Sequence, residues 1–197
     1  MTSNLFDEFE ADGDTLARLH QRLEHAADTA EVLDVAYRTI DTPVGTLLLA
    51  ATTAGLVRVA YDIEGHDVVL AGLADRISPR LLRAPARLDD VARQIDEYFA
   101  KRRTAFEVPV DLRLAEGFRR NVIEHLRDIG YGRRESYATV AAAIGHPRAV
   151  RAVGTACAHN PLPVVIPCHR VVRSDGSTGQ YVGGPLAKST LLDLEAA

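Results

Sequence analysis

The sequence predicts an α+β protein: a small antiparallel sheet with helices, followed by a mostly helical half that contains a helix-turn-helix candidate. Short apolar runs separated by glycine and proline fill residues 35–61, which is typical of an antiparallel meander. From about Leu114 onward, apolar residues recur at helical spacing instead. Because 197 residues allow one or two compact domains, we expect three parts: an extension over 1–30, an α/β domain over 31–112 and a C-terminal domain over 113–197.

The N-terminal elements follow from local patterns. The acidic extension carries leucines at helical spacing, and whether its helix docks on the body stays open at this point. Strands are expected over 35–40, 46–52 and 56–61, with a further edge strand over 106–110, because proline is best tolerated at a sheet edge. Helices are expected over 66–75 and 88–101, the second with Val91, Ile95, Tyr98 and Phe99 on one face.

The C-terminal half is predicted to be helical. One amphipathic helix carries Phe118 to Leu126 and ends near Gly130. Ser136 is a candidate N-cap for a short helix that stops at Gly145. A further helix is expected to open at His146-Pro147 and to end near His159, since proline suits a first helical turn. These last two helices form the helix-turn-helix candidate, although an ordinary helical hairpin is equally compatible with the pattern.

Charge and cysteine usage narrow the classes of function. Residues 1–100 hold 9 basic and 18 acidic side chains, whereas residues 101–197 hold 14 and 9, so net charges of −9 and +5 make up the total of −4. The basic half could face a polyanion. No apolar run is long enough to cross a bilayer and no signal peptide pattern is present, so we expect a cytoplasmic protein. Two cysteines without a Cys-x-x-Cys motif favour free thiols and disfavour a zinc site.

The candidate reactive group is Cys168, which is followed directly by His169 at the end of a proline-bracketed apolar segment. A cysteine is a strong nucleophile only as the thiolate, and with an ordinary pKa of about 8.5 it needs a neighbouring base or positive charge. A buried cysteine beside a solvent-facing histidine is the plainer alternative for an isolated pair, because free cysteine is commonly a small core residue.

The motifs around this pair resemble those of the O6-alkylguanine-DNA alkyltransferases, also called methylated-DNA–protein-cysteine methyltransferases. The resemblance runs in order from about Leu114 to Glu195 and is looser from about Val35 to Leu112. It rests on Ser136-Tyr137, Arg151-Ala152-Val153-Gly154, Asn160-Pro161-Leu162-Pro163, Ile166-Pro167-Cys168-His169-Arg170-Val171-Val172, Gly179-Gln180-Tyr181-Val182-Gly183-Gly184, and Lys188 with Leu191-Leu192 and Glu195.

The resemblance implies a ribonuclease H-like N-terminal domain, a winged-helix-like C-terminal domain and single-turnover DNA repair without a cofactor or metal. The alkyl group of O6-alkylguanine in double-stranded DNA would move to Cys168, and we expect a monomer. His169 takes the position of a base acting through water, and Glu195 that of the carboxylate that orients and charges it. Asn160 corresponds to a residue that holds the active-site turn, and Tyr137 to the proton donor for the leaving guanine.

Further residues match the family's contacts to DNA and to the flipped base. Arg151 corresponds to the arginine that fills the vacated base stack, and Ala152 to a residue of a recognition helix docked in the minor groove. Val153, Gly154 and Ala156 make up the small-residue side of that helix. In the base pocket, the resemblance assigns backbone groups to Val171 and Val182, a wall to Tyr181 and an open lip to Gly183 and Gly184. Phosphate candidates are Arg119, Arg120, Arg133, Arg134, Arg148 and Arg173.

Two alternatives compete with alkyl transfer. Non-catalytic binders of alkylated DNA share the fold but replace the reactive cysteine, so the presence of Cys168 argues against that class. A protease or redox protein with a Cys-His dyad is supported by the dyad alone. Labelled O6-methylguanine DNA would separate the first alternative from the enzyme, and turnover on a peptide or disulfide would revive the second.

Overall fold

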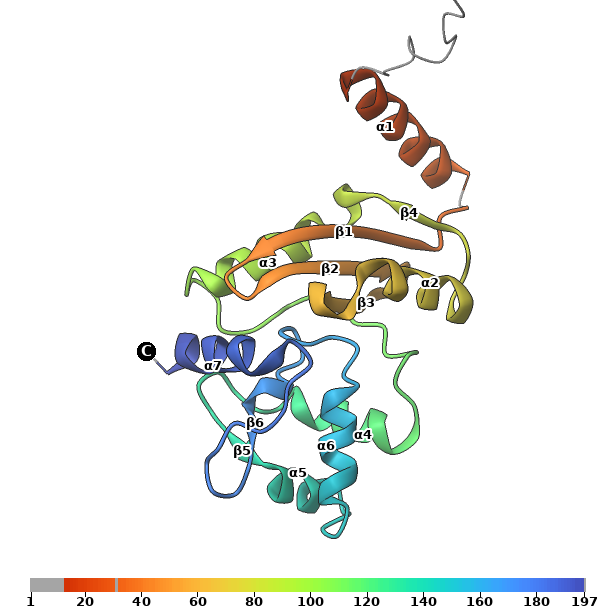
Figure 1. Ribbon diagram of the computed structural model, residues 1–197. Coiled ribbons are helices and arrows are strands. Elements are labelled where there is room, and N and C mark those ends of the chain that lie inside the picture. The colour runs from red at the N-terminus through yellow and green to blue at the C-terminus, as the bar shows by residue number, and fades with distance from the viewer. Residues whose placement is uncertain (1–12, 31, 197) are drawn as a thin grey trace, which may run out of the picture.

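The computed structural model describes residues 13–30 and 32–196. A four-stranded sheet forms the N-terminal half and a cluster of helices forms the C-terminal half (Figure 1). In chain order the elements of the first half are α1 (Gly13–Thr29), β1 (Val35–Thr42), β2 (Gly45–Thr52), β3 (Gly55–Tyr61), η1 (Asp62–Glu64), α2 (His66–Arg76), β4 (Leu81–Arg83), η2 (Pro85–Leu88) and α3 (Asp89–Phe99). The predicted α+β class is confirmed.

The sheet is mixed rather than purely antiparallel. Its strand order is β3-β2-β1-β4, and the three predicted strands pair antiparallel with Tyr37 opposite Ala50 and Leu49 opposite Val59. The fourth strand, β4, was not predicted and runs parallel to β1. The expected edge strand over 106–110 is wrong as a strand: only Val110 bridges to Leu56, at the β3 edge.

Alternation along the strands buries both faces of the sheet. Leu47 and Leu49 of β2 face the cluster that contains α3, whereas Ala50 faces the cluster that contains Leu73 of α2. The α3 cluster continues without a break into the C-terminal helices. One continuous core therefore joins the two halves of the chain.

The C-terminal half consists of α4 (Gly117–Leu126), β5 (Glu135–Ser136), α5 (Tyr137–Ala143), α6 (Val150–Ala158), η3 (Cys168–Arg170), β6 (Val171–Val172) and α7 (Gly184–Glu195). Helices α5 and α6 pack against each other and against α4, as the helix-turn-helix prediction requires. The Ser136 cap is confirmed, because its hydroxyl accepts a hydrogen bond from the Thr139 amide at 3.0 Å. The helix expected to open at Pro147 begins only at Val150, since His146–Ala149 closes a turn first.

The helix predicted in the N-terminal extension is present as α1, and residues 1–12 lie outside the described part. The side chain of His20 bonds the carbonyl of Arg83 at 2.6 Å, so α1 touches the body next to β4. Leu16, Leu19 and Leu23 stay exposed. Among the described residues, no helix is long and apolar enough to cross a membrane.

Candidate active site

The reactive turn connects the end of α6 to η3 and is closed by one buried amide. The side-chain nitrogen of Asn160 donates to the Ile166 carbonyl at 2.9 Å and to Sγ of Cys168 at 3.1 Å, while its oxygen accepts from the Leu162 amide at 3.0 Å. Both N–H groups of the amide are thereby used, and the oxygen keeps one free lone pair. These three hydrogen bonds support the predicted role of Asn160, which is to hold the turn in place.

The same turn contains a strained backbone. Val164 is buried and adopts a φ of +72°, a left-handed conformation that costs a β-branched residue on the order of 1–3 kcal/mol. The bond from the Ile166 amide to the Leu162 carbonyl, at 2.7 Å, keeps the chain in this conformation. The strained residue therefore lies in the turn that leads to Cys168.

His169 and Glu195 form the second part of the site. Nε2 of the imidazole lies 3.0 Å from Oε1 of the carboxylate, and both side chains are buried. A neutral ring facing a carboxylate carries its proton on that nitrogen, so Nδ1 is left as an acceptor. Nδ1 is buried and has no hydrogen-bond partner in the described residues, which leaves it available to take a proton.

The Glu195 carboxylate is the centre of a buried network that joins the two halves. Arg170 donates to both oxygens, from Nε at 2.9 Å and Nη2 at 2.8 Å. The Tyr98 hydroxyl from α3 donates at 2.7 Å, and the Gly132 amide at 3.2 Å. Burial opposes ionisation, but the hydrogen bonds from His169 and Arg170 outweigh it, so the pKa of Glu195 is far below its ordinary value. Sequence reasoning missed Tyr98 as a site residue.

Burial keeps both members of the Cys-His pair uncharged at rest. It raises the pKa of the Cys168 thiol to about 11, although the Asn160 hydrogen bond and the Lys188 charge oppose the rise. Burial also lowers the pKa of His169, against the opposing effect of Glu195. Glu195 favours the charged imidazole but does not outweigh burial, so its expected role in charging the histidine stays a prediction for the reacting state. The imidazolium forms only when a proton leaves the thiol.

The Cys168 thiol should lose its proton only at a pH well above that of an ordinary cysteine. In the free protein, ultraviolet absorbance of the Cys168 thiolate should rise around pH 11 rather than near the ordinary cysteine value of about 8.5. Cys168→Ala supplies the baseline, since Cys157 is buried and the pKa of its thiol is raised as well. An inflection below pH 8 that disappears in Cys168→Ala would contradict a neutral resting thiol.

Lys188 braces the segment after the thiol. Its ammonium group is fully buried, donates to the Val171 carbonyl at 2.7 Å and lies 5.9 Å from the centre of the Tyr137 ring. From the sequence, Lys188 was identified only as part of a family motif, and no contact was predicted for it. This hydrogen bond holds Val171, the residue expected to present its backbone to the base edge.

Three tyrosines, Tyr61, Tyr137 and Tyr181, lie close enough to Cys168 for a charge on the thiol to raise the pKa of their hydroxyls. Tyr181 is predicted as a wall residue, and its hydroxyl lies 3.1 Å from that of Tyr61, a partner from β3 that sequence reasoning missed. Their rings meet edge to face, with centroids 5.7 Å apart. Tyr137 is partly buried at the start of α5, and burial raises the pKa of its hydroxyl, which keeps the proton in place at neutral pH. Val182 is partly buried next to Tyr181.

The two glycines of the expected open lip lie in different surroundings, and the lip itself stays a prediction. A Cβ on Gly183 would lie 2.6 Å from ring atoms of Tyr61, so the glycine permits close packing of the two halves. Gly184 has open space around it but a φ of +83°, which favours glycine.

Gly183→Ala should therefore destabilise the protein by about 1–3 kcal/mol, because the methyl group must displace the Tyr61 ring. Chemical denaturation measures the change. The matched control is Gly72→Ala in α2, where no atom lies within 4 Å of the new Cβ and helix propensity alone favours alanine. Equal stability of Gly183→Ala and the wild type would show that the close contact with Tyr61 does not require glycine at this position.

Helix α6 presents a narrow exposed face away from the core. Arg151 and Ala152 are exposed in its first turn, as expected for residues that meet a partner. Val153 and Ala156 are buried, so their assignment to the small-residue face is corrected: they pack inward. Cys157 is buried and free, in agreement with the prediction of free thiols. Of the phosphate candidates, Arg120 pairs with Glu124 at 2.9 Å.

No group of three or more metal-binding side chains occurs within residues 13–30 and 32–196. The site is built instead from one thiol, one imidazole, one carboxylate and the hydroxyls and amide around them. This set contains a nucleophile and a base with one free nitrogen, which are the groups that transfer to sulfur needs.

Comparison with known proteins gives a consistent result. The family models "6-O-methylguanine DNA methyltransferase, ribonuclease-like domain" and "6-O-methylguanine DNA methyltransferase, DNA binding domain" match residues 35–112 and 117–197. A methylated-DNA–protein-cysteine methyltransferase of Mycolicibacterium paratuberculosis is 37% identical over 82% of this chain and 92% of its own. The bifunctional transcriptional activator/DNA repair enzyme Ada of Escherichia coli is 35% identical over 93% of this chain and 51% of its own. The crystal structure of Mycobacterium tuberculosis OGT in complex with DNA is 36% identical, with a TM-score of 0.71 over 82% of this chain and 92% of that one.

Proposed function

Because the chain belongs to the 6-O-methylguanine DNA methyltransferase family, we propose that it repairs DNA by moving an alkyl group from O6 of guanine to Sγ of Cys168. Curated relatives with 37% and 36% identity bear the name methylated-DNA–protein-cysteine methyltransferase. The observation that supports this chain's own chemistry most directly is the buried set Cys168, Asn160, His169 and Glu195.

Each residue has a role in the transfer that fits its geometry. The thiol proton moves through a water to Nδ1 of His169, and Glu195 stabilises the imidazolium that forms. Sulfur then bonds the alkyl carbon as the bond from that carbon to guanine O6 breaks. Tyr137 gives a proton to the leaving guanine, which its raised pKa keeps available. The thioether is stable, so each molecule acts once.

The substrate proposal is double-stranded DNA that contains O6-alkylguanine, bound by a monomer. A base within a duplex must be extruded before chemistry on it is possible. The exposed first turn of α6 supports insertion there: Arg151 fills the gap, while Ala152 permits close approach of the backbone to the groove. Val171, Val182 and Gly183 border the pocket that receives the base. For the place of action we propose the cytoplasm.

A non-catalytic binder is not favoured, because the cysteine that such proteins replace is present and hydrogen-bonded. A redox pair has no support either, since Cys157 and Cys168 are both buried and free.

The decisive test is intact-mass analysis after incubation with duplex DNA carrying one O6-methylguanine. A gain of one methyl group, mapped to the peptide that contains Cys168, is the expected result. Unmodified protein after exposure to excess substrate would overturn the proposal, and a methyl group on Cys157 would relocate the nucleophile.

The role of Arg151 can be separated from plain charge attraction. Arg151→Ala should slow alkylation by duplex DNA roughly tenfold or more at saturating DNA, because extruding a base costs a few kcal/mol that the arginine offsets. Reaction with free O6-benzylguanine should keep its rate. The control is Arg148→Ala, which removes the same charge from the turn before α6. Equal slowing with duplex and free base would contradict insertion.

A further inference from the structure

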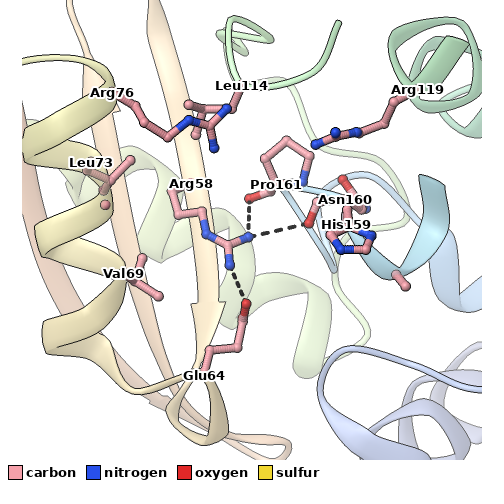
Figure 2. Close-up of a pocket in the computed structure, with 12 residues that line it drawn as sticks. Arg58, Glu64, Val69, Leu73, Arg76, Leu114, Arg119, His159, Asn160 and Pro161 are labelled. Atoms are coloured by element: carbon pink, nitrogen blue, oxygen red, sulfur yellow. Dashed lines mark hydrogen bonds and ion pairs between the residues drawn. The ribbon is translucent and has the colours of Figure 1, made fainter. Parts of the chain in front are cut away.

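A cavity of about 240 Å³ lies between the two halves of the chain, and its lining includes Asn160 at the start of the reactive turn but not Cys168. Helix α2 and strand β3 form one side, and α4 with the end of α6 forms the other (Figure 2). Its lining includes Arg58, Arg76, Leu114, Arg119, His159 and Pro161. Nothing in the proposed transfer uses this space.

One of the three arginines in the cavity is already neutralised. Arg58 forms an ion pair with Glu64 and points its Nη1 at the carbonyls of Asn160 and Pro161, at 3.4 and 3.3 Å. Figure 2 shows these contacts as dashed lines. Glu64 is the one acidic residue in the lining, and this pairing occupies it. Arg58 thus fixes the floor of the cavity next to the start of the reactive turn.

The other two arginines face the cavity with no partner. Arg76 comes from α2 and Arg119 from α4, and their guanidinium groups turn toward the same space above Pro161 (Figure 2). Among the described residues, neither side chain has an acidic or hydrogen-bonding partner. The neighbouring Arg120 differs, because Glu124 pairs with it one turn along α4. Both side chains are exposed, and they line one concave space from separate halves of the chain.

Like charges held close together repel each other, and an anion between them reverses the sign of that interaction. Guanidinium groups present parallel N–H donors that match the oxygens of phosphate better than a halide. We propose that this cavity binds an oxyanion of the phosphate class between Arg76 and Arg119. The bound group would bridge α2 and α4 and thereby tie the two halves together.

The position of the cavity separates it from the DNA-facing turn of α6. His159 at the rim follows the last turn of α6, whereas Arg151 lies in the first, so roughly 12 Å of helix separates them. The phosphate group could come from free inorganic phosphate or from the backbone of a bound duplex. Both sources have the same chemistry at the site, and experiment distinguishes them.

The first measurement is calorimetric titration of the full chain with inorganic phosphate at constant ionic strength. Saturable binding of one phosphate is expected for the wild type. Arg76→Gln combined with Arg119→Gln should weaken it at least about tenfold, since each lost charge-assisted hydrogen bond contributes about 1.5–3 kcal/mol. The matched control combines Arg22→Gln with Arg102→Gln, which removes the same charge from exposed positions outside the cavity. Equal weakening in both pairs, or no saturable binding by a folded wild type, would overturn the proposal.

The second measurement identifies the source. If the phosphate belongs to DNA, the cavity variant should lose more affinity for undamaged duplex than the control pair, and phosphate should compete with duplex. If it is free phosphate, both pairs should bind duplex equally and phosphate should still bind to the DNA-saturated protein. Methylation of Cys168 in the same samples tests the transfer reaction independently, so failure of the anion site leaves that result intact.

Discussion

Cys168→Ala should abolish alkyl transfer completely and leave duplex binding unchanged. The substitution removes the only sulfur that Asn160 holds, while the exposed turn of α6 stays as it is. Loss of a small buried side chain costs on the order of 1 kcal/mol, which a folded domain tolerates. Peptide mapping after reaction measures transfer, and fluorescence anisotropy with labelled duplex measures binding.

The chain offers a matched control in its other cysteine. Cys157→Ala removes an equally buried thiol from α6, and it should retain both binding and transfer. Loss of DNA binding in Cys168→Ala would show that the cysteine is structural. Alkyl label on Cys157 in that variant would show that the turn does not select the nucleophile.

Glu195→Gln should reduce both reactivity and stability, and these two effects have separate causes. The amide cannot stabilise the imidazolium of His169, so the transfer rate should fall by about two orders of magnitude or more, in the range typical of general-base contributions. The same change leaves the Arg170 guanidinium buried without its anion, which costs about 3–5 kcal/mol. Single-turnover kinetics and urea denaturation measure the two losses.

Two companion variants separate the causes. Tyr98→Phe removes one donor from Glu195 without stranding a charge, so we expect a stability loss of about 1 kcal/mol and a small change in rate. Adding Arg170→Met to Glu195→Gln removes the stranded charge, and it should restore stability but not reactivity. Full reactivity of a folded Glu195→Gln protein would remove the carboxylate from proton transfer.

Local patterns predicted the elements whose signals lie within a few residues. The strands over 35–61 were found because glycine and proline interrupt regular apolar runs, and the Ser136 cap because serine directly precedes an apolar helix. Strand β4 was missed because three residues, Leu81–Arg83, carry no period. Pro147 was placed inside a helix because proline is equally suited to the turn that precedes one.

The thiol, imidazole and carboxylate were assigned by their place in motifs, whereas their supporting contacts depend on the tertiary fold. Tyr98 was predicted only as part of the apolar face of a helix, and it donates to a carboxylate 97 positions away. Tyr61 belongs to a strand pattern, and its contact with Gly183 joins opposite halves of the chain. These contacts form only when the two domains pack together. The apolar periodicity of either segment therefore cannot predict them. The raised pKa of the Cys168 thiol likewise follows from its burial in the folded protein, which the sequence pattern does not show.

A protein that reacts once must not be spent on the wrong electrophile. With its thiol protonated up to about pH 11 and enclosed on all sides, Cys168 offers peroxide, disulfides and other cellular oxidants very little thiolate. The base, His169, is already in place, so the sulfur is expected to become a nucleophile when a positioned alkyl carbon arrives. A neutral resting thiol would in this way reserve the single turnover of each molecule for its substrate.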